Sequence, residues 1–82
     1  MLVPMDPNVL TQVKDIVAAL VERPADQVHA GDLLIEDLEL DSLQITELAQ
    51  KVENRTGTPI DEDVLNARGI TVERCAELAS AS

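Results

Sequence analysis

The sequence predicts an all-α fold: a small four-helix bundle, with three main helices, one short helix and a long loop between helices one and two. Apolar residues recur at helical spacing in the stretches assigned to the main helices. Capping residues precede these stretches, and proline or glycine follows most of them. No segment alternates apolar and polar residues over the length of a strand.

The first helix is expected over about residues 7–22. Asp6-Pro7 is a start signal, because an acid caps a helix and proline suits its first position. Pro24 ends the helix, since the residue before a proline is pushed out of the α region. The apolar stripe consists of Val9, Val13, Ile16, Val17 and Leu20, widened by Leu10 and Val21.

A long connection runs from Pro24 to Leu40, with a turn predicted at Ala30-Gly31-Asp32 and room for a short helical turn. A connection this long is uncommon in so small a domain unless it is functional. It has too many apolar residues for a free linker, so we expect it to lie over the core and to bury some of them: Val28, Leu33, Leu34, Ile35, Leu38 and Leu40.

Asp41 is a good N-cap for a second helix over about residues 42–56, in which Ser42 comes first. Gly57 is the expected C-cap residue. At about 100° per residue, one side of this helix carries Ile45, Leu48, Ala49 and Val52. The opposite side carries Leu43, Glu47, Gln50 and Asn54, so Leu43 should point away from the core beside Ser42.

The short helix and the third main helix complete the prediction. Asp61 caps one over about residues 60–65, and Gly69 ends that segment. Thr71 caps a last helix over about residues 72–80, whose inward residues are Val72, Cys75, Ala76 and Ala79, with Leu78 flanking. We expect a single domain over residues 1–82, ordered over about 7–80, which looks free-standing because no linker flanks it.

Composition narrows the classes of function. The formal net charge is −10, from 16 acidic and 6 basic residues, and there is no aromatic residue. Nucleic acids and anionic membranes are disfavoured, because phosphate recognition needs clustered Lys and Arg. Partners with basic patches are favoured, although the charge is explained equally well by solubility. No apolar run could span a bilayer and no basic stretch marks a signal peptide, so the cytoplasm is expected.

Metal and cysteine chemistry fit the sequence poorly. Asp37, Glu39 and Asp41 alternate as calcium ligands do, but Ser42 stands where an EF-hand requires glycine, and Leu48 where it requires glutamate. The single cysteine, Cys75, excludes an internal disulfide. Its inward position favours a buried apolar role over a reactive one, and the ligands for zinc are missing.

A serine hydrolase is disfavoured as well. No Gly-x-Ser-x-Gly elbow surrounds Ser42, and the only histidine, His29, is expected near the surface of the loop. We therefore predict no catalytic residue and no enzyme. Attachment of a group to Ser42 remains, because a phosphate ester there would lie at the positive end of the helix dipole.

The chain resembles the acyl carrier proteins, including polyketide and peptidyl carrier domains, over about residues 7–80. The specific core of the resemblance is Glu36-Asp37-Leu38-Glu39-Leu40-Asp41-Ser42-Leu43, followed by Glu47-Leu48. It implies that a phosphopantetheinyl transferase, using magnesium, moves 4′-phosphopantetheine from coenzyme A to Ser42, which Asp41 helps to present. The resemblance also implies a carrier that delivers acyl or aminoacyl thioesters to successive enzymes. We expect a monomer.

The second helix is the usual docking element in this family, and partner enzymes bring Lys and Arg to it. In this chain the resemblance places Leu43 and Glu47 on the outward face, Glu39 and Asp41 at the mouth and Glu53 toward the flank.

Departures from the family pattern bear on the pathway. Thr46 and Gln50 stand where many fatty-acid carriers have apolar residues, and Leu38 to Leu43 is nearer to the Leu-x-x-Asp-Ser-Leu of polyketide and stand-alone carriers than to peptidyl patterns. We expect a discrete carrier for polyketide or mixed polyketide–nonribosomal peptide biosynthesis. The alternatives are a fatty-acid or free-standing peptidyl carrier, or an unmodified acidic helical interaction module.

Overall fold

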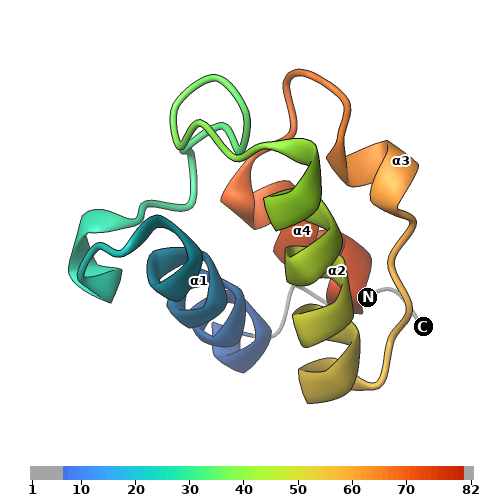
Figure 1. The fold of residues 1–82 in the computed structure, drawn as a ribbon. Coiled ribbons are helices and arrows are strands. Elements are labelled where there is room, and N and C mark those ends of the chain that lie inside the picture. Colours follow the sequence, from blue (N-terminus) through green and yellow to red (C-terminus); the bar gives the residue numbers. More distant parts are fainter. Residues whose placement is uncertain (1–6, 81–82) are drawn as a thin grey trace.

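Helices account for most of the computed structural model, which describes residues 7–80 (Figure 1). The order is α1 (Pro7–Val21), the 3₁₀ turn η1 (Ala25–Gln27), α2 (Ser42–Thr56), α3 (Glu62–Leu65) and α4 (Val72–Ser80). The described residues form no strand, and one isolated bridge pairs Leu33 with Thr71. The predicted all-α bundle is confirmed. The predicted cap Asp6 lies outside the described residues.

α1 begins at Pro7 as predicted and ends at Val21, one residue before the expected boundary. Glu22 adopts a left-handed backbone with φ 56°, and its N–H donates to the Ala19 carbonyl at 3.4 Å. The next N–H, of Arg23, donates to the Ala18 carbonyl at 3.0 Å. This pair of bonds is a Schellman ending, in which glycine normally takes the left-handed position.

The core is aliphatic, and no polar or charged side chain of the described residues is buried in it. α1 packs against both α2 and α4, and α3 packs against α2 (Figure 1). The inward residues predicted for α2 and α4 are all buried, and Leu48 is 0% exposed, so the predicted rotation of both helices is confirmed. The buried residues of α1 are Val13, Ile16, Val17 and Ala18.

The long loop lies on the core as predicted, and η1 is its short helical turn. Residues 30–36 are joined to residues 69–73 by hydrogen bonds, among them one from the Leu34 N–H to the Ile70 carbonyl at 2.9 Å. The Glu36 carboxylate accepts the Gly69 N–H at 3.0 Å. The loop is therefore fixed to the start of α4. Its buried residues are Val28, Leu34, Leu38 and Leu40, and Leu33 and Ile35 are partly buried.

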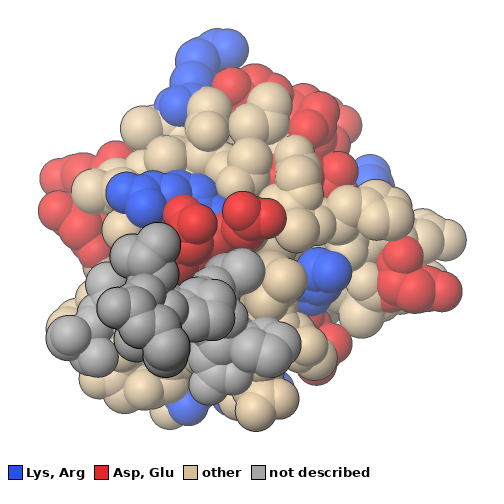
Figure 2. Space-filling view, turned by 180° about the vertical axis from the view of Figure 1, so that it is seen from behind, with Lys and Arg blue, Asp and Glu red and all other residues tan. Residues whose placement is uncertain are grey.

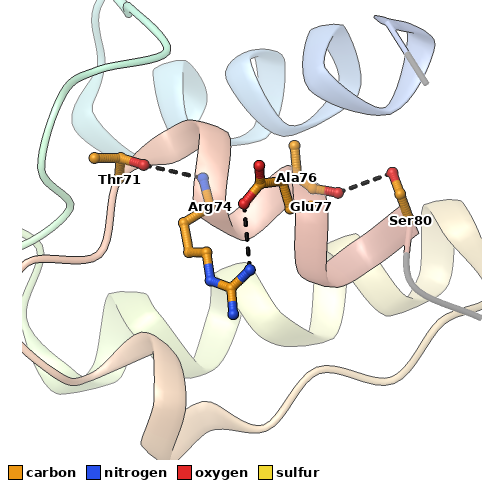
Figure 3. A network of polar contacts seen from close by, with 5 residues as sticks. All are labelled: Thr71, Arg74, Ala76, Glu77 and Ser80. Atoms are coloured by element: carbon orange, nitrogen blue, oxygen red, sulfur yellow. Dashed lines mark hydrogen bonds and ion pairs between the residues drawn. The ribbon is translucent and has the colours of Figure 1, made fainter. Parts of the chain in front are cut away.

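The predicted caps of the later helices are also confirmed, except at the end of α3. Gly57 ends α2 with φ 76°, and the Asp61 carboxylate caps α3 by accepting the Asp63 N–H at 2.9 Å. Thr71 Oγ1 accepts the Arg74 N–H at 3.0 Å at the start of α4 (Figure 3). α3 ends before Gly69, because Asn66 is its C-cap, and Gly69 takes φ 84° in the turn that follows.

Candidate attachment site

Ser42 is the first residue of α2, and its side chain is exposed. The chain reaches it from Leu40, which is buried in the core, through the extended backbone of Asp41. Ile45, three residues further on, is buried again. The backbone on either side of Ser42 is thus anchored in the core, and the hydroxyl stands at the surface where loop and helix meet.

Asp41 and Gln44 form a capping box around Ser42. Asp41 Oδ1 accepts the backbone N–H of Gln44 at 2.8 Å, and Gln44 Oε1 accepts the N–H of Asp41 at 3.0 Å. The N-cap role predicted for Asp41 is confirmed. The part taken by Gln44 was not predicted, although glutamine three residues after a capping residue is the sequence signal of this motif.

The side chain of Gln44 makes a further contact, with α1. Its Nε2 donates to the carbonyl oxygen of Leu20, 3.2 Å away, in the last turn of α1. The residue is partly buried between the two helices. The Gln44 side chain is therefore hydrogen-bonded both to the start of α2 and to the end of α1.

The acidic residues that precede Ser42 have different structural roles. The Asp37 carboxylate accepts the Leu33 N–H at 2.8 Å, within the loop. Glu39 is exposed and adopts φ 58°, a left-handed backbone that directs the chain back so that Leu40 enters the core. Asp41 lies at the positive end of the α2 dipole, where a carboxylate is stabilising. The mouth of the site thus presents two exposed carboxylates, those of Glu39 and Asp41.

Leu43 points outward as predicted, and the residue is 67% exposed. Glu53 is exposed and Glu47 is partly buried on the same helix. A second exposed apolar residue, Val64 on α3, was not predicted, and its helix packs against α2. Single exposed apolar residues are common on proteins, so the position of Leu43 beside Ser42 matters more than its exposure alone.

The basic residues of α2 lie further along the helix. Lys51 and Arg55 line a shallow hollow of about 270 Å³ together with Asp15 and Ile16 of α1. Lys51 follows Ser42 by nine residues, or about 13 Å along a helix axis. The opposite face of the molecule from that in Figure 1 shows acidic and basic side chains interspersed (Figure 2). The basic residues of α2 are thus separated from Ser42 along the helix, whereas the acidic residues Glu39 and Asp41 closely precede it in the chain.

Other candidate chemistry finds little support. Within residues 7–80, no group of three or more His, Cys, Asp and Glu side chains could hold a metal ion. His29 is exposed in the loop, as expected, and its backbone N–H donates to Asp32 Oδ2 at 2.9 Å. Burial raises the pKa of the Cys75 thiol to about 12, so the predicted buried apolar role of this residue is confirmed. No described helix has the length and apolar character that crossing a membrane requires.

Comparison with known proteins finds a matching family model and a similar protein. Residues 11–78 match a family model described as a phosphopantetheine attachment site. The chain is also similar to acyl carrier protein 3 of Ralstonia nicotianae, with 33% identity over 58 residues that span 71% of this chain and 67% of that protein. The first match covers the long loop, α2 and α3 completely.

Proposed function

Because the chain belongs to the acyl carrier protein family, whose members carry covalently attached 4′-phosphopantetheine, we propose that Ser42 bears this group. The observation that carries the proposal is the exposed hydroxyl of Ser42 at the first residue of α2. Ser42 is also the only serine within the matched residues 11–78. Among the threonines there, Thr46 and Thr56 donate their hydroxyls to carbonyl groups of α2.

The start of α2 suits a phosphodiester. A helix leaves its first N–H groups without partners inside the helix, and here Asp41 takes the N–H of Gln44. The N–H groups of Ser42 and Leu43 precede it, at the positive end of the dipole, where phosphate oxygens are favoured. The backbone N–H groups at the start of α2 therefore fit the phosphate of the group that the family carries.

Attachment is a transfer in which the Ser42 hydroxyl is the one reacting group of the carrier. Ser42 Oγ forms a bond to the phosphorus that bears the pantetheine of coenzyme A. The bond from that phosphorus to the oxygen of adenosine 3′,5′-bisphosphate breaks, and the hydroxyl proton passes to a base on the transferase. When bound, the group supplies a thiol that holds an acyl or aminoacyl cargo as a thioester. We propose that the carrier itself performs no catalysis.

The proposal is tested by mass. Apo protein is incubated with coenzyme A, magnesium and a broad-specificity phosphopantetheinyl transferase, and the intact mass is measured. We expect a gain of one phosphopantetheine group that is lost in Ser42→Ala and kept in the matched control Ser80→Ala. Ser80 is suited to this control because its hydroxyl donates to the Ala76 carbonyl at 2.9 Å (Figure 3). A gain that survives Ser42→Ala would overturn the assignment.

We also propose a docking surface for the transferase and for acyl-transferring or acyl-modifying enzymes with basic patches. Complementary charge steers such encounters and is weakened by salt. Glu47→Lys should slow transfer at low salt without unfolding the protein, whereas Asn54→Lys, an exposed position further along α2, should do so less. Equal rates for Glu47→Lys and the unsubstituted protein would remove Glu47 from the surface. The surface consists of Leu43, Glu47, Glu39, Asp41 and Glu53.

For the pathway, we propose a discrete, monomeric carrier of polyketide or mixed polyketide–nonribosomal peptide biosynthesis. The support is the pattern from Leu38 to Leu43 and the polar residues at two positions of α2. Thr46 donates its hydroxyl to the Ser42 carbonyl at 3.0 Å, and Gln50 is exposed. Loading of the modified protein by a malonyl transferase, and not by an aminoacyl-activating enzyme, would support a polyketide role over a peptidyl one.

A further inference from the structure

The side-chain amide of Gln44 forms hydrogen bonds at the ends of two helices. Its Oε1 accepts the Asp41 N–H at the start of α2, and its Nε2 donates to the Leu20 carbonyl at the end of α1. Leu20 is among the last four residues of α1, whose carbonyls lack partners inside the helix. The carbonyls of Ala18 and Ala19 accept hydrogen bonds in the Schellman ending, and Gln44 donates to the carbonyl that follows them, that of Leu20.

These contacts restrain the turn on which Ser42 stands. The side chains of Ser42 and Leu43 are exposed, so neither holds the first turn of α2 against the core. The bonds within the capping box order the turn itself, and helix ends otherwise fray. The bond to Leu20 links α2 to a carbonyl 24 residues earlier in the chain and so fixes the turn sideways against α1.

We propose that Gln44 is a positioning residue for the modification of Ser42. The inference rests on the proposed function, because it concerns the hydroxyl that the transferase has to reach. Transfer requires Ser42 Oγ to meet the phosphorus in line with the leaving oxygen, and a small misplacement of a reacting atom costs much of the rate. By tying the first turn of α2 to α1, the Gln44 amide holds the backbone of Ser42, and with it the direction of the Cα–Cβ bond that carries Oγ, in one orientation.

Gln44→Glu separates the two contacts of the amide. A glutamate keeps an oxygen that accepts the Asp41 N–H, but it places a second oxygen opposite the Leu20 carbonyl, where the donor was. Gln50→Glu is the matched control, because it adds the same charge to the same helix at an exposed position. Gln44→Met removes both contacts at similar size.

The transfer kinetics of apo proteins are measured at a temperature at which circular dichroism shows every variant to be folded. We expect kcat to fall about three- to tenfold in Gln44→Glu, the effect of losing one hydrogen bond, and further in Gln44→Met. Gln50→Glu should keep kcat, and any general effect of added charge on docking should appear in its KM. Backbone NMR order parameters should fall for residues 42–44 of the Gln44 variants alone.

A purely structural role for Gln44 predicts a lower melting temperature with an unchanged kcat of the folded protein. An unchanged kcat in Gln44→Glu, with unsubstituted protein still modified at Ser42, would overturn this inference and leave the proposed function standing. If the unsubstituted protein gains no phosphopantetheine, both the proposed function and the inference fail.

Discussion

Asp41 has one role that the structure shows and a second that we propose, and a pair of substitutions can separate them. It caps α2 through the bond from the Gln44 N–H to Asp41 Oδ1 at 2.8 Å, and in the proposed function its charge helps to present Ser42 to the transferase. Asp41→Ala removes both the acceptor and the charge. Asp41→Asn keeps an oxygen acceptor in nearly the same place and removes only the charge.

The position of Asp41 in the structure sets the loss of stability that we expect in each variant. Loss of an N-cap acceptor to alanine costs about 1 kcal/mol of stability, within a range of about 0.5–2. Asparagine caps about as well as aspartate, so Asp41→Asn should lose only the interaction of charge with the helix dipole, about 0.3–1 kcal/mol. Asp41 is exposed, so water and salt will keep this loss near the lower figure. Alanine should therefore cost clearly more than asparagine.

Urea denaturation followed by circular dichroism measures both losses. A domain of 82 residues has a total stability of about 4–12 kcal/mol, so a change of 1 kcal/mol shifts the midpoint visibly. The same variants are then assayed for transfer of phosphopantetheine. We expect Asp41→Asn to keep most of the stability and to lose kcat/KM, with the loss of kcat/KM shrinking as salt is added.

Two results would refute this reasoning. Equal destabilisation by alanine and asparagine would mean that Asp41 acts through its charge and not as a hydrogen-bonding cap. An unchanged kcat/KM in Asp41→Asn would mean that the transferase does not require the carboxylate.

Three further predictions concern stability. Glu22→Gly should stabilise the fold by about 0.5–1 kcal/mol in urea denaturation. The left-handed backbone costs an L-residue about 1–2 kcal/mol, and glycine avoids this cost but loses more conformational entropy on folding, so the net gain is smaller. Glu22→Ala should give no such gain. Burial raises the pKa of Cys75 from 9.0 to about 12, so the folded state binds the thiol proton more tightly than the unfolded state does. The contribution of this residue to the free energy of unfolding is therefore complete below pH 9 and is lost as the pH rises toward 12. Urea denaturation at a series of pH values should show a smaller decline in this range for Cys75→Ala. Leu48→Ala should cost about 2–5 kcal/mol and Leu48→Met less than about 1.5, and a negligible cost of alanine would contradict the packing of α2.

Local signals were enough to locate most of the helices. α2 begins and ends where Asp41 and Gly57 predict, because a cap and a left-handed glycine act within a few residues of the chain. The outward position of Leu43 followed from the helical period alone. The end of α1 was misplaced by one residue, since a glutamate in the left-handed region is not a signal that sequence patterns carry.

Contacts between elements could not be predicted in the same way. The helical period predicts on which face of its own helix a side chain lies, but it does not predict which other element that side chain contacts. The bond from Gln44 to Leu20 and the bonds from the loop to residues 69–73 depend on how α1, α2 and α4 pack. The chemistry near Ser42 was thus predictable as a set of residue types, whereas the side chain that steadies it was not.

The burial of Cys75 has a consequence for the lifetime of a cargo. A thioester is lost by exchange whenever a second thiolate reaches its carbonyl carbon. The chain has a single cysteine, and it is fully buried in the core with a pKa of about 12, so it is neutral and enclosed at physiological pH. A carrier of this design has no thiolate of its own within the described residues that competes for the cargo. Thiol exchange with the cargo therefore depends on thiols that other molecules supply.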